Sequence, residues 1–349
     1  MLRINNDNIE SIKNAYCTKL KAWMNFEDTD KNKLLKQINK YNTRTKYCEM
    51  LRHLYDNFDN VIGSSFEGLM AINNTFITRF KNEYDEYLTK TNDEDRKETD
   101  FGYFKWRMVE YYQQFFSSDI KNDPDYNNFS AGRWLTKVLN VKVCPYCNHN
   151  YIFTINEKRG KDKSGNLVTT IVTRPQLDHF YSKSLNPLLA LSFYNLVPSC
   201  SVCNTIKKDR DITFSPYDNK NTETYILSIN SEGDENPSEW ITGKGKIDIK
   251  IKHTYDGKTE TPDNDIKNNV KQLGLNKIYE EHIDYVEEIV DKIYAYNKDY
   301  YKAMVDDFTG LGKSPNEIDV IIWNAYLKEN EKRPMSKLTT DILRQLKLI

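Results

Sequence analysis

Two C-x-x-C pairs constrain this chain more than any other feature of its sequence. Four of the six cysteines lie in them, Cys144 with Cys147 and Cys200 with Cys203, and 52 residues separate the pairs. Two thiolates at positions i and i+3 of a tight turn can both reach one tetrahedral ion, and two such turns complete its shell without a water. We therefore predict a structural Zn²⁺ at these four cysteines, which supplies folding free energy rather than catalysis.

Chance burial, disulfides and a redox motif fit these cysteines less well than zinc does. Unrelated buried cysteines would not be expected to fall into two matched pairs. Disulfides are disfavoured in the cytosol, and a thioredoxin-like motif needs only one pair in a βαβ setting. The remaining two, Cys17 and Cys48, lie in helical patterns far from the pairs, and we expect them to be core thiols.

The composition excludes disorder and a membrane span. Aromatic residues make up 13% of the 349 residues, which is too much ring surface for a disordered chain. No stretch approaches the roughly 18 consecutive apolar residues that a membrane helix needs, and the first residues do not resemble a secretory signal. We therefore expect a cytoplasmic protein of about two structural units.

The charge distribution points to an anionic partner. The whole chain is nearly neutral, with 50 Lys and Arg against 51 Asp and Glu. Residues 141–220 hold 11 of the cations and 6 of the anions, which leaves 39 against 45 in the remainder. Positive charge is therefore concentrated in one segment, as nucleic-acid binding requires.

The hydrophobic pattern predicts an α+β protein in three regions. Residues 1–140 are expected to form four or five helices, 141–220 a zinc-bound core, and 221–349 a short β-hairpin followed by helices. In the core, Tyr151–Ile155 and Leu167–Thr173 are expected to pair across a long charged loop. In the last region, alternating Ile247, Ile249 and Ile251 predict a strand that ends in a turn at Asp256-Gly257, with Tyr225–Ile229 as its partner.

Polar residues that bear chemistry lie between and just after the cysteine pairs. Pro175–Phe180 can form a strand, Leu196–Ser199 a returning strand, and the chain from Cys203 a helix. This arrangement would bring Asp178 and Asn204 together as oxygen ligands for a hard cation. The order of Asp178-His179, Asn195 and Asn204 around the pairs resembles the HNH nucleases, also called ββα-metal or His-Me finger enzymes.

The resemblance implies a role for each of these residues. His179 would be the general base that deprotonates the attacking water, Asp178 and Asn204 would hold one Mg²⁺ or Mn²⁺, and Asn195 would orient His179. The expected products carry a 5′ phosphate and a 3′ hydroxyl. Asn204 stands where many members have His. The family's Gly-rich connector is replaced by Asn186–Tyr194, which we expect to shape access to the site.

The remaining charged, aromatic and histidine residues receive weaker assignments. Lys207, Lys208 and Arg210 are candidate phosphate contacts, although a solvated helix face explains them almost as well. The aromatic run Phe101–Phe116 is expected to be a core helix. The histidines besides His179 are expected to be structural, with His149 an outside candidate for zinc: His53, His149, His253 and His282.

A narrower resemblance extends over more of the chain. Cys144-Pro-Tyr-Cys147-Asn, the segment from Asp178 to Ser184 and the closing Arg333-Pro-Met-Ser-Lys-Leu338 look similar to PtuB-like nuclease subunits of Septu antiphage systems, also found beside retrons. That group implies an ABC-type ATPase as partner, and this chain has no P-loop itself. DNA is the favoured substrate. The alternatives are an RNA substrate such as tRNA, or a non-catalytic zinc-containing subunit for nucleic-acid binding or assembly.

Overall fold

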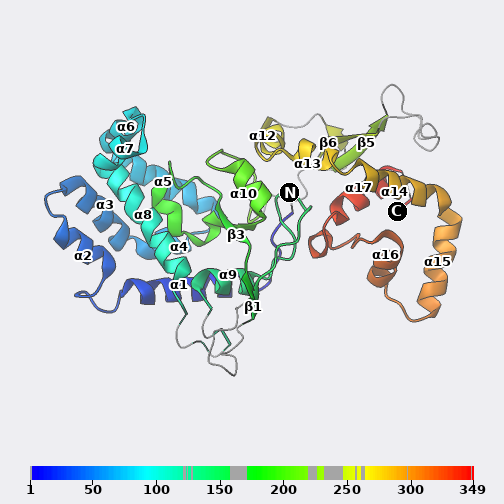
Figure 1. Ribbon diagram of the computed structural model, residues 1–349, viewed down its shortest axis with the longest axis horizontal. Coiled ribbons are helices and arrows are strands. Elements are labelled where there is room, and N and C mark those ends of the chain that lie inside the picture. Colours follow the sequence, from blue (N-terminus) through cyan, green and yellow to red (C-terminus); the bar gives the residue numbers. More distant parts are fainter. Residues whose placement is uncertain are drawn as a thin grey trace, which may run out of the picture.

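The computed structural model describes residues 2–120, 123, 125–126, 129–157, 171–218, 226–231, 247–255, 258–260, 264–296, 298–346 and 348–349. Figure 1 shows two lobes. The N-terminal helices, coloured blue to cyan, form one lobe, and the C-terminal elements, yellow to red, form the other. The segment with β3 and α10 lies between them, so the candidate site residues occupy the middle of the molecule.

The regular elements of the N-terminal lobe are all helices in its described residues, apart from one isolated β-bridge between Asp119 and Ser130. Its nine helices are α1 (Ile9–Met24), α2 (Lys33–Lys40), α3 (Thr45–Asp56), α4 (Phe58–Gly63), α5 (Phe66–Arg79), α6 (Lys81–Thr89), α7 (Asp93–Glu98), α8 (Asp100–Ser117) and α9 (Ala131–Leu139). The expected four or five helices are therefore wrong in number. Short polar breaks divide them: Asn25 ends α1 in the left-handed conformation, and the side chain of Asn32 caps α2.

Helix α8 is the centre of this lobe. It packs against α3, α7 and α9, and its buried side chains include Phe101, Phe104 and Phe115. The prediction of a core helix over the aromatic run is thus confirmed. Tyr112, on the same helix, contacts the strand segment instead, so α8 also forms a wall of the middle region.

The middle region contains two small antiparallel sheets. Strands β1 (Ile155–Glu157) and β2 (Ile171–Thr173) form one, and the expected loop between them lies outside the described residues apart from its first positions. The strand expected over Tyr151–Ile155 is displaced, because Tyr151 pairs in an isolated bridge with Val143 and the pairing with β2 begins only at Ile155.

The second sheet pairs β3 (Gln176–His179) with β4 (Leu196–Ser199), and His179 lies opposite Leu196. Two 3₁₀ turns, η1 (Pro187–Leu191) and η2 (Phe193–Asn195), connect the strands, and α10 (Ser201–Lys207) follows β4 directly. The expected order of strand, strand and helix is present at the expected residues.

The C-terminal lobe begins with a three-stranded sheet of β5 (Ile226–Ser231), β6 (Ile247–Tyr255) and β7 (Lys258–Glu260). Ile229 lies opposite Ile249, which confirms the predicted pairing, while the turn at 256–257 lies outside the described residues. The helices that follow are α12 (Asn264–Gln272), α13 (Leu275–Glu280), α14 (Ile283–Ala295), α15 (Lys298–Gly310), α16 (Pro315–Trp323), the short η3 (Asn330–Lys332) and α17 (Ser336–Gln345).

The first C-x-x-C turn connects distant parts of the chain. The amide of Leu2 donates to the carbonyl of Pro145 at 2.8 Å, the hydroxyl of Tyr279 donates to the carbonyl of Cys147 at 2.5 Å, and the amide of Met335 donates to the carbonyl of Asn148 at 2.7 Å. Residues 144–148, here called the first knuckle, therefore join the N-terminal segment and the C-terminal lobe to the candidate site.

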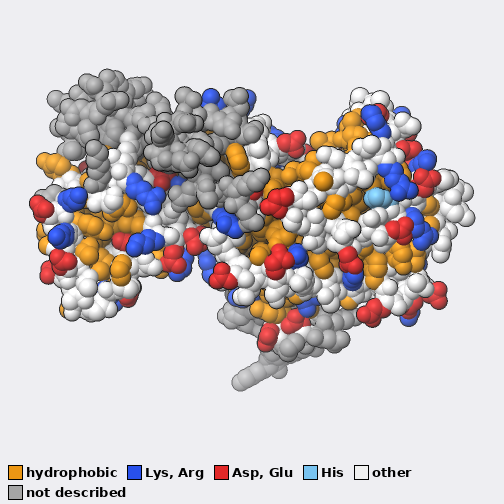
Figure 2. All heavy atoms as spheres, turned by 180° about the vertical axis from the view of Figure 1, so that it is seen from behind, with side chains coloured by type: hydrophobic (Ala, Val, Ile, Leu, Met, Phe, Trp, Pro, Cys, Tyr) orange, Lys and Arg blue, Asp and Glu red, His pale blue; other side chains and the backbone are white. Residues whose placement is uncertain are grey.

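The surface carries charge of both signs. On the face seen in Figure 2, Lys and Arg side chains are interspersed with Asp and Glu over both lobes. Within the described part of the chain, none of the helices combines the length and the apolar character needed to cross a lipid bilayer.

Candidate metal centre and polar cavity

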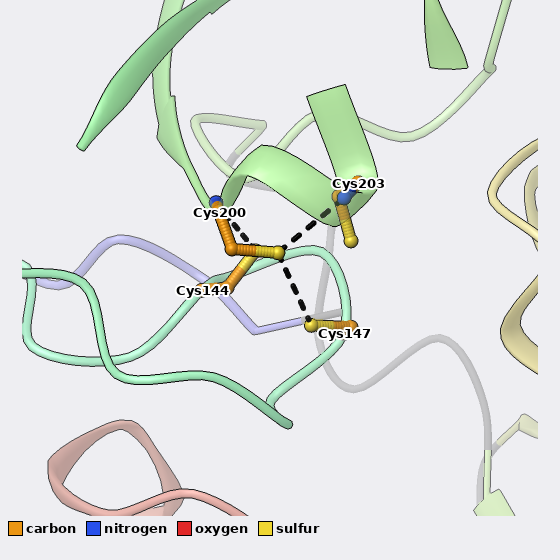
Figure 3. Close-up of side chains that lie close together, drawn as sticks. All are labelled: Cys144, Cys147, Cys200 and Cys203. Atoms are coloured by element: carbon orange, nitrogen blue, oxygen red, sulfur yellow. Dashed lines mark hydrogen bonds between the residues drawn. The ribbon is translucent and has the colours of Figure 1, made fainter. Parts of the chain in front are cut away.

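The four paired cysteines form one buried cluster. The Sγ atoms of Cys144, Cys147, Cys200 and Cys203 all lie within 4.8 Å of one another. Figure 3 shows the first pair on the loop before β1 and the second pair at the start of α10, with the sulfurs directed toward a common centre. The cluster can therefore hold a structural metal ion such as zinc.

Its geometry agrees with a tetrahedral thiolate site. Zn–S bonds of about 2.3 Å give sulfur–sulfur distances near 3.8 Å in a tetrahedron, and Sγ of Cys147 lies 4.0 Å from Sγ of Cys200. Backbone amides of His149, Cys200 and Cys203 donate to sulfurs of the cluster, each at 3.4 Å.

The histidine beside the cluster is not among the potential ligands that the described residues bring together. His149 contacts the cluster through its backbone amide, and its ring lies 4.3 Å from the ring of His282, measured between centroids. His53 lies on α3 near Arg79, and the side chain of His253 lies outside the described residues.

A polar cavity of about 500 Å³ lies where β3 meets α10. Three of the four predicted catalytic residues line it: Asp178 and His179 from the end of β3, and Asn204 from α10. Successive residues of a strand usually point to opposite faces, but His179 is the last residue of β3. Asp178 and His179 both line the same cavity, which agrees with a strand end at which the two side chains splay apart.

His179 is held as a neutral imidazole. Its Nε2 lies 3.0 Å from the carbonyl oxygen of Ala190, and because a carbonyl can only accept, Nε2 carries the proton. Nδ1 then carries the lone pair, and no described residue makes a hydrogen bond to it. Burial lowers the pKa of His179 to about 3, and the nearby ammonium of Lys183 acts in the same direction.

Asp178 is a buried carboxylate with two partners on one oxygen. The hydroxyl of Tyr146 donates to Oδ2 at 2.7 Å, and Nζ of Lys207 lies 3.2 Å from the same atom. Burial raises the pKa of Asp178, and these two partners oppose that effect. No described residue makes a hydrogen bond to Oδ1.

Asn195 fastens the segment that follows His179. Its Oδ1 accepts from the amide of Tyr181 at 2.7 Å, and its Nδ2 donates to the carbonyls of Tyr181 and Leu189 at 3.1 and 3.0 Å. Leu189 precedes Ala190, whose carbonyl accepts from His179. Asn195 therefore fixes both chain segments that determine the position of the imidazole.

Oxygen donors for a hard cation are present on both sides of the cavity. Nδ2 of Asn204 donates to Oε1 of Gln176 at 2.5 Å, which leaves its amide oxygen without a hydrogen bond from the described residues. Together with Oδ1 of Asp178, this oxygen fits the donor set that Mg²⁺ or Mn²⁺ takes alongside several waters.

The predicted phosphate contacts occupy three different places. Lys208 lines the cavity. Lys207 is fully buried, and its ammonium donates to the carbonyl of His179 at 2.8 Å in addition to its pairing with Asp178, so it does not point into solvent. Arg210 lies outside the cavity lining and is within 3.5 Å of the carbonyl of Gln272.

The connector between β3 and β4, Asn186–Tyr194, is not a loop that controls access to the cavity. Its residues Pro187–Leu191 are buried, and it is bonded to the helical lobe: Tyr16 donates to the carbonyl of Leu191 at 2.7 Å, and Ser192 donates to that of Val61 at 2.6 Å. The expectation that it shapes access is therefore wrong. Its apolar composition instead anchors the strands in the helical lobe and presents the carbonyl of Ala190 to His179.

Several residues near the site were not predicted from the sequence. Arg174 and Lys183 line the cavity, and the ring of Tyr112 packs edge-on against His179 at 4.6 Å between centroids. Tyr146 could have been noticed inside the C-x-x-C turn, and Lys183 four residues after His179. No sequence signal connects Tyr112 on α8 to the site.

Comparison with models of known protein families, with curated proteins and with solved structures finds no match to this chain.

Proposed function

We propose that this chain is a metal-dependent nuclease of the HNH type, with DNA as the favoured substrate. The observation that carries the proposal is the convergence of Asp178, His179 and Asn204 on one cavity that Arg174, Lys183 and Lys208 also line. These three cations exceed the two carboxylates of that lining, Asp178 and Asp209. Asp209 itself accepts from the hydroxyls of Ser182 and Ser184 at 2.7 and 3.1 Å, so the cavity suits a phosphodiester.

His179 is suited to accept a proton from water. The bond from Nε2 to Ala190 fixes the tautomer, and the lone pair of Nδ1 is available for a water molecule. The lowered pKa keeps the ring neutral near pH 7, and the negative charge of a bound phosphate would raise it toward the working range.

The other residues would hold the substrate and the cation. Asp178 and Asn204 offer the oxygens for Mg²⁺ or Mn²⁺, which when bound supplies charge stabilisation to the scissile phosphate and the leaving 3′ oxygen. Lys183 and Lys208, which line the cavity, would contact phosphate oxygens. The cysteine cluster, as a zinc site, would hold β3, β4 and α10 in place.

The biological setting rests on the resemblance alone. Similarity to PtuB-like subunits supports a role as the effector nuclease of a bacterial antiphage system that acts with an ABC-type ATPase. The same site could act on RNA such as tRNA, because phosphate contacts do not distinguish the two sugars. The remaining alternative is a non-catalytic zinc-containing subunit that binds nucleic acid.

Cleavage assays test the proposal. Zinc-loaded protein is incubated with supercoiled plasmid and, separately, with total tRNA, with and without added Mg²⁺. We expect Mg²⁺-dependent cutting of plasmid, reduced about 10²- to 10⁴-fold in His179→Ala, the usual contribution of a general base. His53→Ala is the matched control. Cutting of tRNA alone would favour the RNA substrate, and equal cutting by wild type and His179→Ala would contradict the assignment of the base.

A further inference from the structure

Each half of the cysteine cluster places one side chain on the same carboxylate oxygen. Tyr146 lies inside the first C-x-x-C turn, between Cys144 and Cys147, and Lys207 lies one helical turn after Cys203 on α10. Both side chains are fully buried, and both contact Oδ2 of Asp178, at 2.7 and 3.2 Å. Asp178, the candidate metal ligand, is thus held by one side chain from each half of the cysteine cluster.

The two contacts are made with one carboxylate oxygen and leave the other without a hydrogen bond from the described residues. A carboxylate fixed at Oδ2 by two donors cannot rotate without breaking both contacts. Oδ1 receives no hydrogen bond from the described residues, and Asp178 lines the cavity. Partners behind a metal ligand commonly orient it and set the affinity of the site.

The burial of Lys207 supports a specific task for its charge. An ammonium with no exposure to solvent is costly unless it is paired and hydrogen-bonded. Lys207 meets both conditions through Asp178 and the carbonyl of His179, which are the two neighbouring residues of the candidate site. Its ammonium therefore ties both site residues to α10.

We infer that Tyr146 and Lys207 are positioning residues that link the cysteine cluster to the cation site by holding Asp178 with Oδ1 toward the cavity. The inference rests on the proposed function, because it takes Asp178 as a ligand of a divalent cation. It extends that function by making the cluster a determinant of cation affinity as well as of folding.

The test measures cation binding rather than cleavage. Full-length, zinc-loaded protein is titrated with Mn²⁺, and the free ion is followed by electron paramagnetic resonance, with zinc content measured on the same samples. Tyr146→Phe removes one hydroxyl, and Lys207→Met removes one charge at similar length. We expect each to weaken Mn²⁺ binding about 10- to 100-fold while zinc content stays at the wild-type level.

Two matched controls separate positioning from general destabilisation. Tyr279→Phe removes a buried hydroxyl that also contacts the first knuckle, at the carbonyl of Cys147. Lys337→Met removes a fully buried ammonium that pairs with Asp341 at 2.9 Å. Both controls should leave the Mn²⁺ affinity unchanged.

The outcomes distinguish this inference from the proposed function. Unchanged affinity in Tyr146→Phe would overturn the inference, and tighter binding in Lys207→Met would show that Lys207 competes with the cation instead of positioning its ligand. In either case Mg²⁺-dependent cleavage that requires His179 would leave the nuclease proposal standing. If Lys207→Met does not fold, Tyr146→Phe decides alone. Wild-type protein that binds no Mn²⁺, or binds it equally well as Asp178→Asn, would overturn both.

Discussion

The side-chain carbonyl of Asn148 accepts a hydrogen bond of 2.9 Å from the backbone amide of Lys337, 189 residues further along the chain. The amide group of the same side chain donates to the carbonyl of Asn330, also at 2.9 Å. Asn148 is fully buried and has a φ of 50°, a left-handed conformation that Asn tolerates better than most residues. One side chain of the first knuckle therefore fastens the start of α17.

Asn148→Gly tests this connection, because glycine keeps the backbone conformation and removes the side chain. Two buried backbone groups lose their partners, so the free energy of unfolding should fall by about 1–3 kcal/mol for each group left unpaired. Urea denaturation measures the change. Asn324 has a similar φ of 57° but is exposed, so Asn324→Gly should change stability by less than about 0.5 kcal/mol. Equal effects of the two substitutions would contradict the anchoring role.

The cysteine cluster should be required for folding. Cys147→Ser and Cys203→Ser each remove one ligand, and structural zinc supplies about 10–16 kcal/mol in small zinc domains, as much as the whole stability of a typical domain. We expect loss of bound metal and insoluble protein, measured by metal analysis and by the soluble fraction after expression. Cys48→Ser, far from the cluster, should keep both. Full metal content in Cys203→Ser would disprove a four-cysteine site.

Asn195→Ala should destabilise the protein and displace His179. Three backbone groups lose their hydrogen bonds, and the buried carbonyl of Leu189 alone accounts for about 1–3 kcal/mol. The segments on both sides of the imidazole also lose their common fastening. Thermal denaturation should show the loss. Asn57, which donates one bond to the carbonyl of His53, provides the control, and a shift in Asn57→Ala as large as that in Asn195→Ala would argue against a special role for Asn195.

Asp319 on α16 should give a pH-dependent stability effect far from the cavity. Burial raises its pKa above the ordinary value of 3.8, against a smaller opposing effect of Tyr301. A raised pKa in the folded state means that the stability linked to this group is present below 3.8 and is lost as pH rises through the folded pKa. Asp319→Asn should therefore be more stable than wild type at pH 7, and the difference should shrink as the pH falls toward 3.8.

Urea denaturation at several pH values measures this difference, and Asp306→Asn, at an exposed position, is the control. A difference that grows on acidification would contradict the sign.

The parts of the site that follow from local spacing could be predicted from the sequence. The spacing within each C-x-x-C pair, the two strands around Asp178 and Leu196, and the helix that begins at Ser201 each depend on residues that are close together along the chain, so the C-x-x-C spacing and the hydrophobic pattern indicate them directly. The pairing of β5 with β6 follows from the alternation of Ile247, Ile249 and Ile251.

The parts that depend on tertiary packing could not be predicted. Lys207 lies in a polar sequence typical of a solvated helix, and only the presence of Asp178 across the fold explains its burial. Tyr112 reaches His179 from a helix 67 residues upstream. The number of N-terminal helices depends on short polar breaks such as Asn25, and hydrophobic periodicity does not indicate where these breaks lie.

The long-range bonds of the first knuckle also have a consequence for synthesis on the ribosome. Residue 337 leaves the ribosome 189 residues after Asn148, a delay of roughly 10–40 s at about 5–20 residues per second. During that interval the two cysteines of the first knuckle have already been synthesised. The carbonyl of Asn148, however, still lacks its hydrogen-bond donor, the amide of Met335. Completion of the hydrogen bonds around Asn148 is thereby delayed until translation has passed residue 337, so a truncated chain that ends before α17 would lack the bonds that fasten the first knuckle to the C-terminal lobe.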